Sequence, residues 1–168
     1  MKRTINTNLA KKKDLFDVLA LSEAIGLPVL LIGDPGVAKT AAVMDYAGTA
    51  LGEISNNDQV VSPIADAKFV IINEIDKASA SLRNSLLGVM NEKYIFNGTE
   101  KKKCQWDAFV ATCNEIPEDE INSPFWDRFA ITFRVDRLRE ADMLDYFARG
   151  GRASKTQYVV NLPEAGEV

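Results

Sequence analysis

The sequence predicts an α/β protein in which a parallel sheet is flanked by helices. Short, wholly apolar runs alternate along the chain with longer segments that carry apolar residues at helical spacing. Strands without apolar–polar alternation are typical of a sheet covered on both faces, and strands that alternate with helices are typical of parallel sheets. The 168 residues, 46% of them hydrophobic and 26% charged, suit one globular domain with a real core.

The first part of the chain provides two helices and one strand. The spacing of apolar residues predicts a helix over residues 11–25, with Gly26 as its stop and the lysines at its start as a solvated end. The apolar run 29–32 follows as the first strand. A second helix is predicted over residues 41–51, and the polar, weakly patterned stretch 53–67 is predicted to be a loop.

The middle of the chain predicts a strand, a helix and a hairpin. Residues 69–72 form another apolar run, and residues 79–92 carry apolar residues on one helical side. Residues 94–103 predict a hairpin, because Asn97-Gly98 is a strong turn signal.

Two further strands and a helix complete the predicted elements. Residues 109–113 form a third buried strand. Residues 131–135 alternate between apolar and polar, so this strand is expected nearer a sheet edge. A helix is predicted over residues 138–148, and we expect no secondary structure in residues 152–168.

The stretch between the first strand and the second helix matches a phosphate-binding loop. It is close to the Walker A pattern G-x-x-x-x-G-K-[ST]. Small residues let backbone N–H groups converge on phosphate oxygens, and the positive end of the following helix favours the same anion. Lys39 would reach the terminal phosphates and the Thr40 hydroxyl would bind Mg²⁺. The residues expected to bind the nucleotide are Gly33, Asp34, Pro35, Gly36, Val37, Ala38, Lys39 and Thr40.

One position departs from the Walker A pattern. Ala38 stands where a second glycine is expected. Because alanine cannot adopt a positive φ as cheaply as glycine, we expect Ala38 to have helix-like backbone angles. The alternative interpretation is an ordinary glycine-bearing turn. The order of strand, loop, Lys-Thr and helix favours the phosphate loop.

Polar residues follow two other apolar strands directly. Asn73 and Glu74 come after the second strand and Asn114 after the third, and ligands of parallel sheets bind at these carboxyl ends. An acidic pair there is the Walker B arrangement, whose first residue holds Mg²⁺ and whose second activates the attacking water. Glu74 can polarise a water. Asn73 brings no charge but can accept a hydrogen bond from Mg²⁺-bound water, so Thr40 and Asn73 are the predicted metal-site residues; a capping role for Asn73-Glu74 is the alternative.

Composition excludes several other functions. The net charge of −4 argues against a general nucleic-acid binder, although a local patch stays open. No apolar run is long enough for a transmembrane helix, and the first residues lack the apolar core of a signal peptide, so a cytoplasmic protein is expected. The absence of histidine excludes His-based triads and His metal sites. Cys104 and Cys113 lack metal-site spacing and are expected to be free thiols.

Four stretches, in order, resemble successive motifs of the MoxR group of AAA+ ATPases: residues 33–40, 69–78, 109–115 and 126–129. The resemblance extends over about residues 14–148. It implies a P-loop NTPase (AAA+) fold with a small β-hairpin before the sensor 1 strand, and ATP and Mg²⁺ as cofactors. It further implies that Asn114 is the sensor 1 residue, which helps to orient the attacking water. Arg128 would be an arginine finger offered to the nucleotide of a neighbouring subunit.

Members of this group form ATP-dependent rings, usually hexamers, that remodel or activate other proteins, and many act beside a von Willebrand factor A domain partner. The resemblance therefore implies a homo-oligomeric ring, a protein client, and neither membrane nor specific nucleic acid as a partner. Residues 1–150 would form the AAA+ nucleotide-binding core, and residues 151–168 a tail or the start of a missing lid.

Three departures from the family pattern stand out. Asn73 replaces the usual aspartate, the spacing from Gly33 to Asn73 is short, and the sequence stops at Val168, where the family's helical lid should begin. We expect the ordered remainder of a longer protein, with segments absent after Leu51 and after Val168; a reduced protein is the alternative. The missing strand would be a sheet edge, so the central sheet would survive its loss.

The leading functional hypothesis is an ATP-hydrolysing ring subunit that remodels, activates or assembles partner proteins. The alternative is a nucleotide-dependent assembly or binding subunit with little or no hydrolysis, which Asn73 and the missing lid favour. A small-molecule P-loop kinase is a weaker hypothesis, because such kinases do not need Asn114 or the 127–129 motif. Adenine is preferred over guanine by the resemblance alone.

Overall fold

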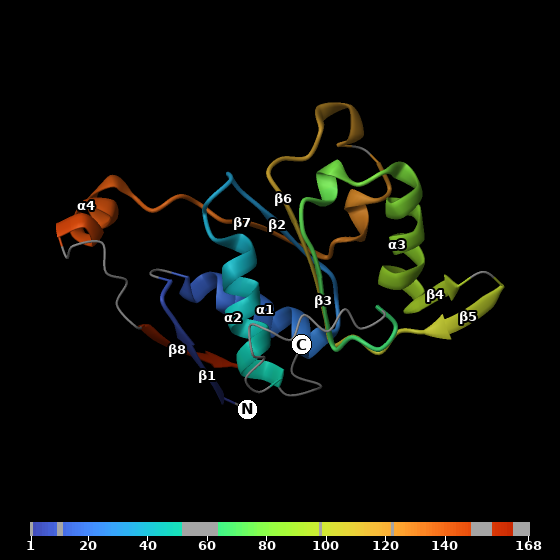
Figure 1. Ribbon diagram of the computed structural model, residues 1–168, viewed down its shortest axis with the longest axis horizontal. Coiled ribbons are helices and arrows are strands. Elements are labelled where there is room, and N and C mark those ends of the chain that lie inside the picture. Colours follow the sequence, from blue (N-terminus) through green and yellow to red (C-terminus); the bar gives the residue numbers. More distant parts are fainter. Residues whose placement is uncertain are drawn as a thin grey trace.

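A four-stranded parallel sheet forms the centre of the protein. The computed structural model describes residues 2–9, 12–51, 64–97, 99–121, 123–148 and 156–162. The sheet has the order β3-β6-β2-β7, and each neighbouring pair runs parallel. The predicted α/β fold and the edge position of the last strand are confirmed (Figure 1). The strands are β2 (Val29–Ile32), β3 (Phe69–Ile72), β6 (Ala108–Cys113) and β7 (Ile131–Arg134).

The helices begin and end close to the predicted positions. The chain leaves α1 through Gly26, whose positive φ of 64° allows its N–H to bond the carbonyl oxygen of Ser22 at 2.8 Å. Ser79 caps α3 by accepting a hydrogen bond from the N–H of Leu82 at 3.2 Å. The α2 helix starts at Lys39, two residues before the predicted start, because the phosphate loop leads directly into its first turn. The helices are α1 (Lys13–Ile25), α2 (Lys39–Leu51), α3 (Ala80–Glu92) and α4 (Glu140–Ala148).

Each face of the sheet is covered by its own apolar cluster. Along β2, Val29 and Leu31 belong to the cluster beneath α1 and α2, whereas Leu30 and Ile32 belong to the cluster beneath α3. Figure 1 shows α1 and α2 on one side of the sheet and α3 on the other. Because successive side chains point to opposite faces, a strand covered on both faces must be apolar throughout. This explains why the sequence of β2 shows no alternation.

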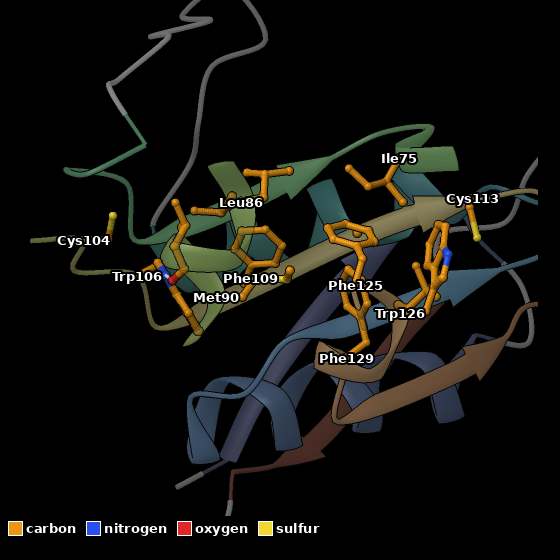
Figure 2. Close-up of a cluster of buried hydrophobic side chains, with 14 of the residues drawn as sticks. Ile75, Leu86, Met90, Cys104, Trp106, Phe109, Cys113, Phe125, Trp126 and Phe129 are labelled. Atoms are coloured by element: carbon orange, nitrogen blue, oxygen red, sulfur yellow. Dashed lines mark hydrogen bonds between the residues drawn. The ribbon is translucent and has the colours of Figure 1, made fainter. Parts of the chain in front are cut away.

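The cluster beneath α3 is rich in aromatic side chains. Phe125, Trp126 and Phe129 are all buried, and their ring centroids lie 5.1–6.4 Å apart. Figure 2 shows these three rings grouped near Cys113 at the end of β6. Burial raises the pKa of the Cys113 thiol to about 12. Cys113 and Cys104 are free thiols, as expected.

A second, two-stranded antiparallel sheet was not expected from the sequence. It joins β1 (Lys2–Thr7) to β8 (Thr156–Asn161). The expectation of no secondary structure in residues 152–168 is therefore wrong for residues 156–161. The two strands have few fully buried side chains, Ile5 and Val160 among them, so neither segment shows a strong apolar pattern. Their partners are remote in sequence, and pairing of this kind leaves little local signal.

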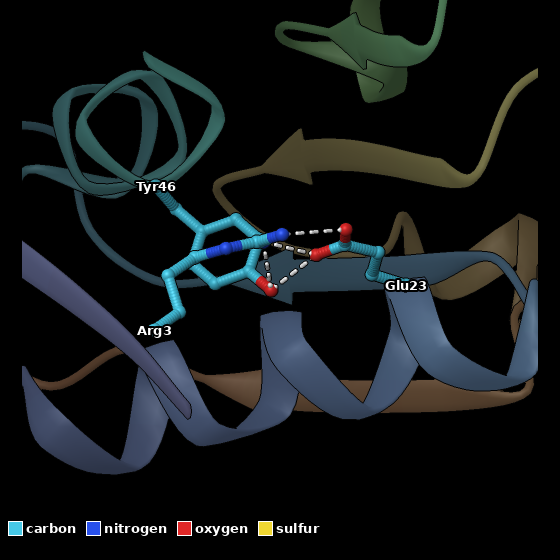
Figure 3. Close-up of polar contacts among 3 residues, drawn as sticks. All are labelled: Arg3, Glu23 and Tyr46. Atoms are coloured by element: carbon cyan, nitrogen blue, oxygen red, sulfur yellow. Dashed lines mark hydrogen bonds and ion pairs between the residues drawn. The ribbon is translucent and has the colours of Figure 1, made fainter. Parts of the chain in front are cut away.

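A polar network attaches β1 to the helices. The guanidinium of Arg3 donates to Glu23 at 3.0 Å and to the Tyr46 hydroxyl at 2.9 Å, and that hydroxyl donates to Glu23 at 2.5 Å (Figure 3). Burial, with the bond to Glu23, raises the pKa of the Tyr46 phenol. The network ties the first strand to α1 and to α2, the helix that carries the end of the phosphate loop.

The predicted hairpin is confirmed, and three short 3-10 turns complete the described part of the fold. The hairpin pairs β4 (Tyr94–Asn97) with β5 (Glu100–Lys103); Gly98 of its predicted turn and residues 53–63 of the predicted loop lie outside the described residues. None of the helices in the described part of the chain has the length and apolar character needed to span a membrane. The 3-10 turns are Ile75–Lys77, Glu118–Glu120 and Trp126–Arg128.

Candidate functional site

The ammonium group of Lys39 lies inside the loop that joins β2 to α2. Only 9% of Lys39 is exposed. Its ammonium donates to the carbonyl oxygens of Gly33 at 2.5 Å and Asp34 at 3.1 Å, and to the side-chain oxygen of Asn114 at 3.3 Å. Two predicted site residues that are 75 positions apart therefore meet at the carboxyl ends of β2 and β6. A bound anion could replace the backbone carbonyls as the partner of the Lys39 ammonium group.

Only glycine fits at position 33, because its backbone lies against Val135, the residue that follows β7. A Cβ atom at this position would lie 2.4 Å from the carbonyl oxygen of Val135, which is too close for any side chain. The N–H of Gly33 donates to the carbonyl oxygen of Cys113, and the N–H of Val135 donates to that of Ile32. These bonds fix the start of the loop between its two neighbouring strands.

Ala38 adopts a backbone conformation that the sequence analysis did not expect. Its φ is 65°, in the left-handed region, so the expectation of helix-like angles is wrong. The left-handed region costs a non-glycine residue roughly 1–2 kcal/mol. The loop must turn sharply into α2 here, since the carbonyl oxygen of Ala38 already accepts from the N–H of Ala42 at 3.0 Å. Backbone strain of this kind clusters at sites that bind ligands.

Thr40 and Asn73 are in direct contact. The Thr40 hydroxyl donates to the side-chain oxygen of Asn73 across 2.8 Å. The hydroxyl of Thr112 on β6 donates to the same oxygen at 3.4 Å and accepts from the backbone N–H of Glu74 at 3.3 Å. The sequence analysis missed Thr112, which is only 2% exposed. Its one sequence signal is a hydroxyl inside an otherwise apolar strand.

Glu74 presents its carboxylate to solvent at the end of β3. Its φ of 52° and ψ of 49° place it in the left-handed region. The carboxylate forms an ion pair with Lys77 at 2.9 Å, and both side chains are more than half exposed. The hydrogen bond to Glu74 raises the pKa of the Lys77 ammonium. Because an exposed ion pair of this kind is weak, Glu74 can exchange Lys77 for another partner.

A cavity of about 230 Å³ is lined by the start of α1, the end of β7 and the segment that follows β7. Its wall includes Arg137, whose guanidinium forms an ion pair with the side chain of Asp34 at 2.7 Å. Lys12 also lines it and is only 9% exposed, so the expectation of a solvated basic helix end is wrong for this lysine. Burial lowers the pKa of Lys12, and the nearby charge of Asp136 opposes that effect. Lys12 lines this cavity together with the segment after β7, a proximity that the sequence of α1 alone could not show.

Arg128 lies on the surface, apart from the loop. It is exposed on the last 3-10 turn, and among the described residues no hydrogen bond or ion pair joins it to the phosphate loop. The turn is held by the buried ring of Phe125, over which the guanidinium of Arg83 lies at 5.9 Å. Arg83 also forms a bidentate ion pair with Glu120. The structure therefore presents Arg128 outward from a firmly packed segment.

A family model described as the MoxR domain in the MoxR-vWA-beta-propeller ternary systems matches residues 50–162, which is more than half of the chain. The phosphate loop lies before the matched range. Two uncharacterized proteins of Methanocaldococcus jannaschii also match. MJ0079 is 21% identical over 98% of this chain and 50% of its own length, and MJ0812 is 22% identical over 86% and 46%. The chain thus spans about half the length of the curated relatives it matches.

Solved structures share the fold. A "putative ATPase" from Cytophaga hutchinsonii superposes with a TM-score of 0.61 and 19% identity, over 92% of this chain and 55% of that one. NtrX from Brucella abortus in complex with ADP superposes with a TM-score of 0.60 and 13% identity, over 85% and 40%. The complex of NtrX with ATP gives a TM-score of 0.56 and 13% identity, over 76% and 35%. At these identities the likeness shows the fold alone.

Proposed function

Because the chain belongs to the MoxR domain family of the MoxR-vWA-beta-propeller systems, we propose that it is a ring-forming AAA+ subunit that binds and hydrolyses ATP to remodel, activate or assemble partner proteins. The observation that carries the proposal is the meeting of Lys39 with Asn114, and of Thr40 with Asn73, at the carboxyl ends of β2, β6 and β3. In parallel α/β sheets this edge is where ligands bind.

The phosphates of ATP would lie in the loop of residues 33–40. Lys39 would exchange its carbonyl partners for the terminal phosphates, and the N–H groups at the start of α2 would face the same anion. The base would enter the cavity of about 230 Å³ after β7, because one of its lining residues, Arg137, forms an ion pair with Asp34 of the loop. NtrX, which shares the fold, was crystallised with ATP and with ADP.

The oxygens of Thr40 and Asn73 fit a Mg²⁺ site. Mg²⁺ prefers oxygen ligands, keeps several waters and is usually held largely by substrate phosphates. The two side-chain oxygens lie 2.8 Å apart and neither is buried away from solvent. When bound, the ion would neutralise charge that develops on the phosphates. Because neither side chain is charged, the phosphates would provide most of the affinity for the ion.

The carboxylate of Glu74 would polarise the attacking water. It would first leave its ion pair with Lys77, which costs little because both groups are exposed. Asn114 contacts the Lys39 ammonium through its oxygen and would help to orient the same water. Glu74 is fixed through its backbone N–H to Thr112, so its side chain can move while its main chain stays in place.

Arg128 would complete the site of a neighbouring subunit. It is exposed on a 3-10 turn, and within the described part of the chain no hydrogen bond or ion pair joins it to the phosphate loop. An arginine placed in this way can stabilise transition-state charge in trans. We therefore propose a homo-oligomeric ring, by family a hexamer, acting in the cytoplasm with a von Willebrand factor A domain protein as a partner. The division into a core of residues 1–150 and a tail of residues 151–168 stays a prediction.

Asn73 supports a second candidate function. A neutral amide at the metal position gives weaker hydrogen bonds to Mg²⁺-bound water than a carboxylate. The chain would then bind ATP and change its assembly without appreciable turnover. This candidate shares the nucleotide site and differs in the rate of hydrolysis alone.

The deciding experiment measures phosphate release and native mass on the same preparation. We expect the wild-type protein to release phosphate from ATP at saturating Mg²⁺, and its native mass to increase when ATP is added. A mass increase without phosphate release would support the assembly subunit. If the assembled protein neither bound ATP nor hydrolysed it, both candidates would be contradicted.

A further inference from the structure

A chain of hydrogen bonds runs beneath the candidate metal site. The backbone N–H of Glu74 donates to the Thr112 hydroxyl at 3.3 Å, and that hydroxyl donates to the side-chain oxygen of Asn73 at 3.4 Å. The same oxygen accepts from the Thr40 hydroxyl at 2.8 Å. Asn73 and Glu74 lie at the end of β3, Thr40 lies on α2, and Thr112 comes from β6, an inner strand of the sheet.

Asn73 has an orientation problem that an aspartate would not have. An amide carries an oxygen acceptor at one end and an NH₂ donor at the other, whereas both ends of a carboxylate accept. A rotation of the amide by half a turn would aim the NH₂ group at the metal position, where it repels the cation and its bound waters. The oxygen must therefore be held toward Thr40.

The Thr112 hydroxyl is placed to hold the Asn73 oxygen in this orientation. Its hydroxyl oxygen is occupied by the N–H of Glu74, so its proton is directed to another acceptor, and the Asn73 oxygen is within reach. Thr112 is 2% exposed, so water does not compete for this proton. Thr40 alone is a weaker restraint, since its hydroxyl is partly exposed and water can compete for its proton.

We propose that Thr112 is a positioning residue that fixes the Asn73 amide with its oxygen toward the metal position. This inference rests on the proposed nucleotide site. It explains how a chain with asparagine in place of the usual aspartate can retain a defined site for Mg²⁺-ATP. It predicts that the effect of Thr112 depends on the residue at position 73.

A double-substitution cycle tests this dependence. The affinity of a fluorescent ATP analogue is measured in excess Mg²⁺ and in EDTA for the wild type, Thr112→Val, Asn73→Asp and the double variant. We expect Thr112→Val to weaken binding in Mg²⁺ by about three- to tenfold, as the loss of one buried hydrogen bond would, and to leave binding in EDTA unchanged. With Asn73→Asp present, Thr112→Val should change binding in Mg²⁺ by less than about twofold. Thr112→Ser, which keeps the hydroxyl, should bind like the wild type.

Three outcomes would overturn the proposal. Equal losses for Thr112→Val with and without Asn73→Asp would show that the hydroxyl does not act through the amide. Equal losses of ATP affinity in Mg²⁺ and in EDTA would show that Thr112 supports the structure of the loop and not the metal position. A wild-type protein that binds no ATP in either buffer would remove the proposed function itself, and the inference with it. Circular dichroism establishes that each variant is folded, and Thr112→Ala replaces Thr112→Val if valine is not tolerated.

Discussion

The hydroxyl of Thr40 and the side-chain oxygen of Asn73 are hydrogen-bonded across 2.8 Å, although the two residues are 33 positions apart. This contact joins the end of the phosphate loop to the end of β3. The two groups proposed to bind Mg²⁺ therefore lie side by side, and binding the ion would require little rearrangement of the backbone. Preorganisation of this kind strengthens binding by reducing its entropic cost.

We expect Asn73→Asp to lower the Mg²⁺ concentration needed for turnover and to raise the rate several-fold. A carboxylate accepts charge-assisted hydrogen bonds, worth about 1.5–3 kcal/mol against about 0.5–1.5 kcal/mol for a neutral acceptor. The new carboxylate would repel Glu74 when Mg²⁺ is absent, so a slight loss of stability in EDTA is also expected. Phosphate release measured against Mg²⁺ concentration checks this. If neither the rate nor the Mg²⁺ requirement changes, Asn73 is not at the metal.

Glu74→Gln should keep ATP bound and slow its hydrolysis strongly, by about 10²- to 10⁴-fold if Glu74 is the general base. An amide cannot polarise the attacking water, whereas the phosphate contacts of Lys39 are untouched. Single-turnover phosphate release and nucleotide affinity are measured together. Glu92→Gln is the matched control, because Glu92 is an exposed carboxylate at the end of α3. Turnover at the wild-type rate in Glu74→Gln would remove Glu74 from the mechanism.

Much of the fold could be predicted because its strands are buried on both faces. The apolar runs of β2, β3 and β6 indicate in the sequence that these strands are covered on both faces. Because the strands are parallel, the residues that follow them lie at one edge of the sheet. The pairing of β1 with β8 could not be predicted, since it depends on a partner about 150 positions away. Each strand alone shows no clear pattern.

The missed details of the site have two causes. The burial of Lys12 and the hydrogen bonds of Thr112 involve segments remote in sequence, whereas the positive φ of Ala38 belongs to the sharp local turn from the loop into α2. A propensity or a pattern describes a residue against its own neighbours in the chain. Lys12 and Thr112 owe their surroundings to tertiary contacts, which only the folded arrangement contains.

Ala38→Gly should stabilise the protein by roughly 0.5 kcal/mol. Glycine adopts the left-handed conformation without the cost of roughly 1–2 kcal/mol that alanine has, which stabilises the folded protein. The greater freedom of glycine in the unfolded chain lowers the free energy of unfolding by about 0.4–1 kcal/mol, so the net gain is smaller. Ala41→Gly is the control, because Ala41 lies in the first turns of α2 and its replacement should destabilise the protein. Thermal unfolding checks both changes. A lower melting temperature for Ala38→Gly would show that the strained conformation is not the one adopted in solution.

Arg128 should act on the nucleotide of a neighbouring subunit. Arg128→Ala and Lys39→Ala proteins are each expected to be inactive alone. A random equimolar mixture leaves about one interface in four with both groups intact, because a ring interface is heterologous. We expect the mixture to recover turnover in that proportion. Mixed rings that remain as inactive as either parent, with co-assembly verified by native mass, would place Arg128 outside the site.

The most direct test of the nucleotide site is the affinity for ATP of Lys39→Ala beside that of the wild type, measured by calorimetric titration. Lys39 is the buried cation of the loop, and its contacts with phosphate would be charge-assisted, so its loss should weaken binding by about 10- to 100-fold or more. Lys68→Ala, at the opposite end of β3, should bind ATP like the wild type. If Lys39→Ala binds ATP with wild-type affinity, the phosphates do not lie in this loop.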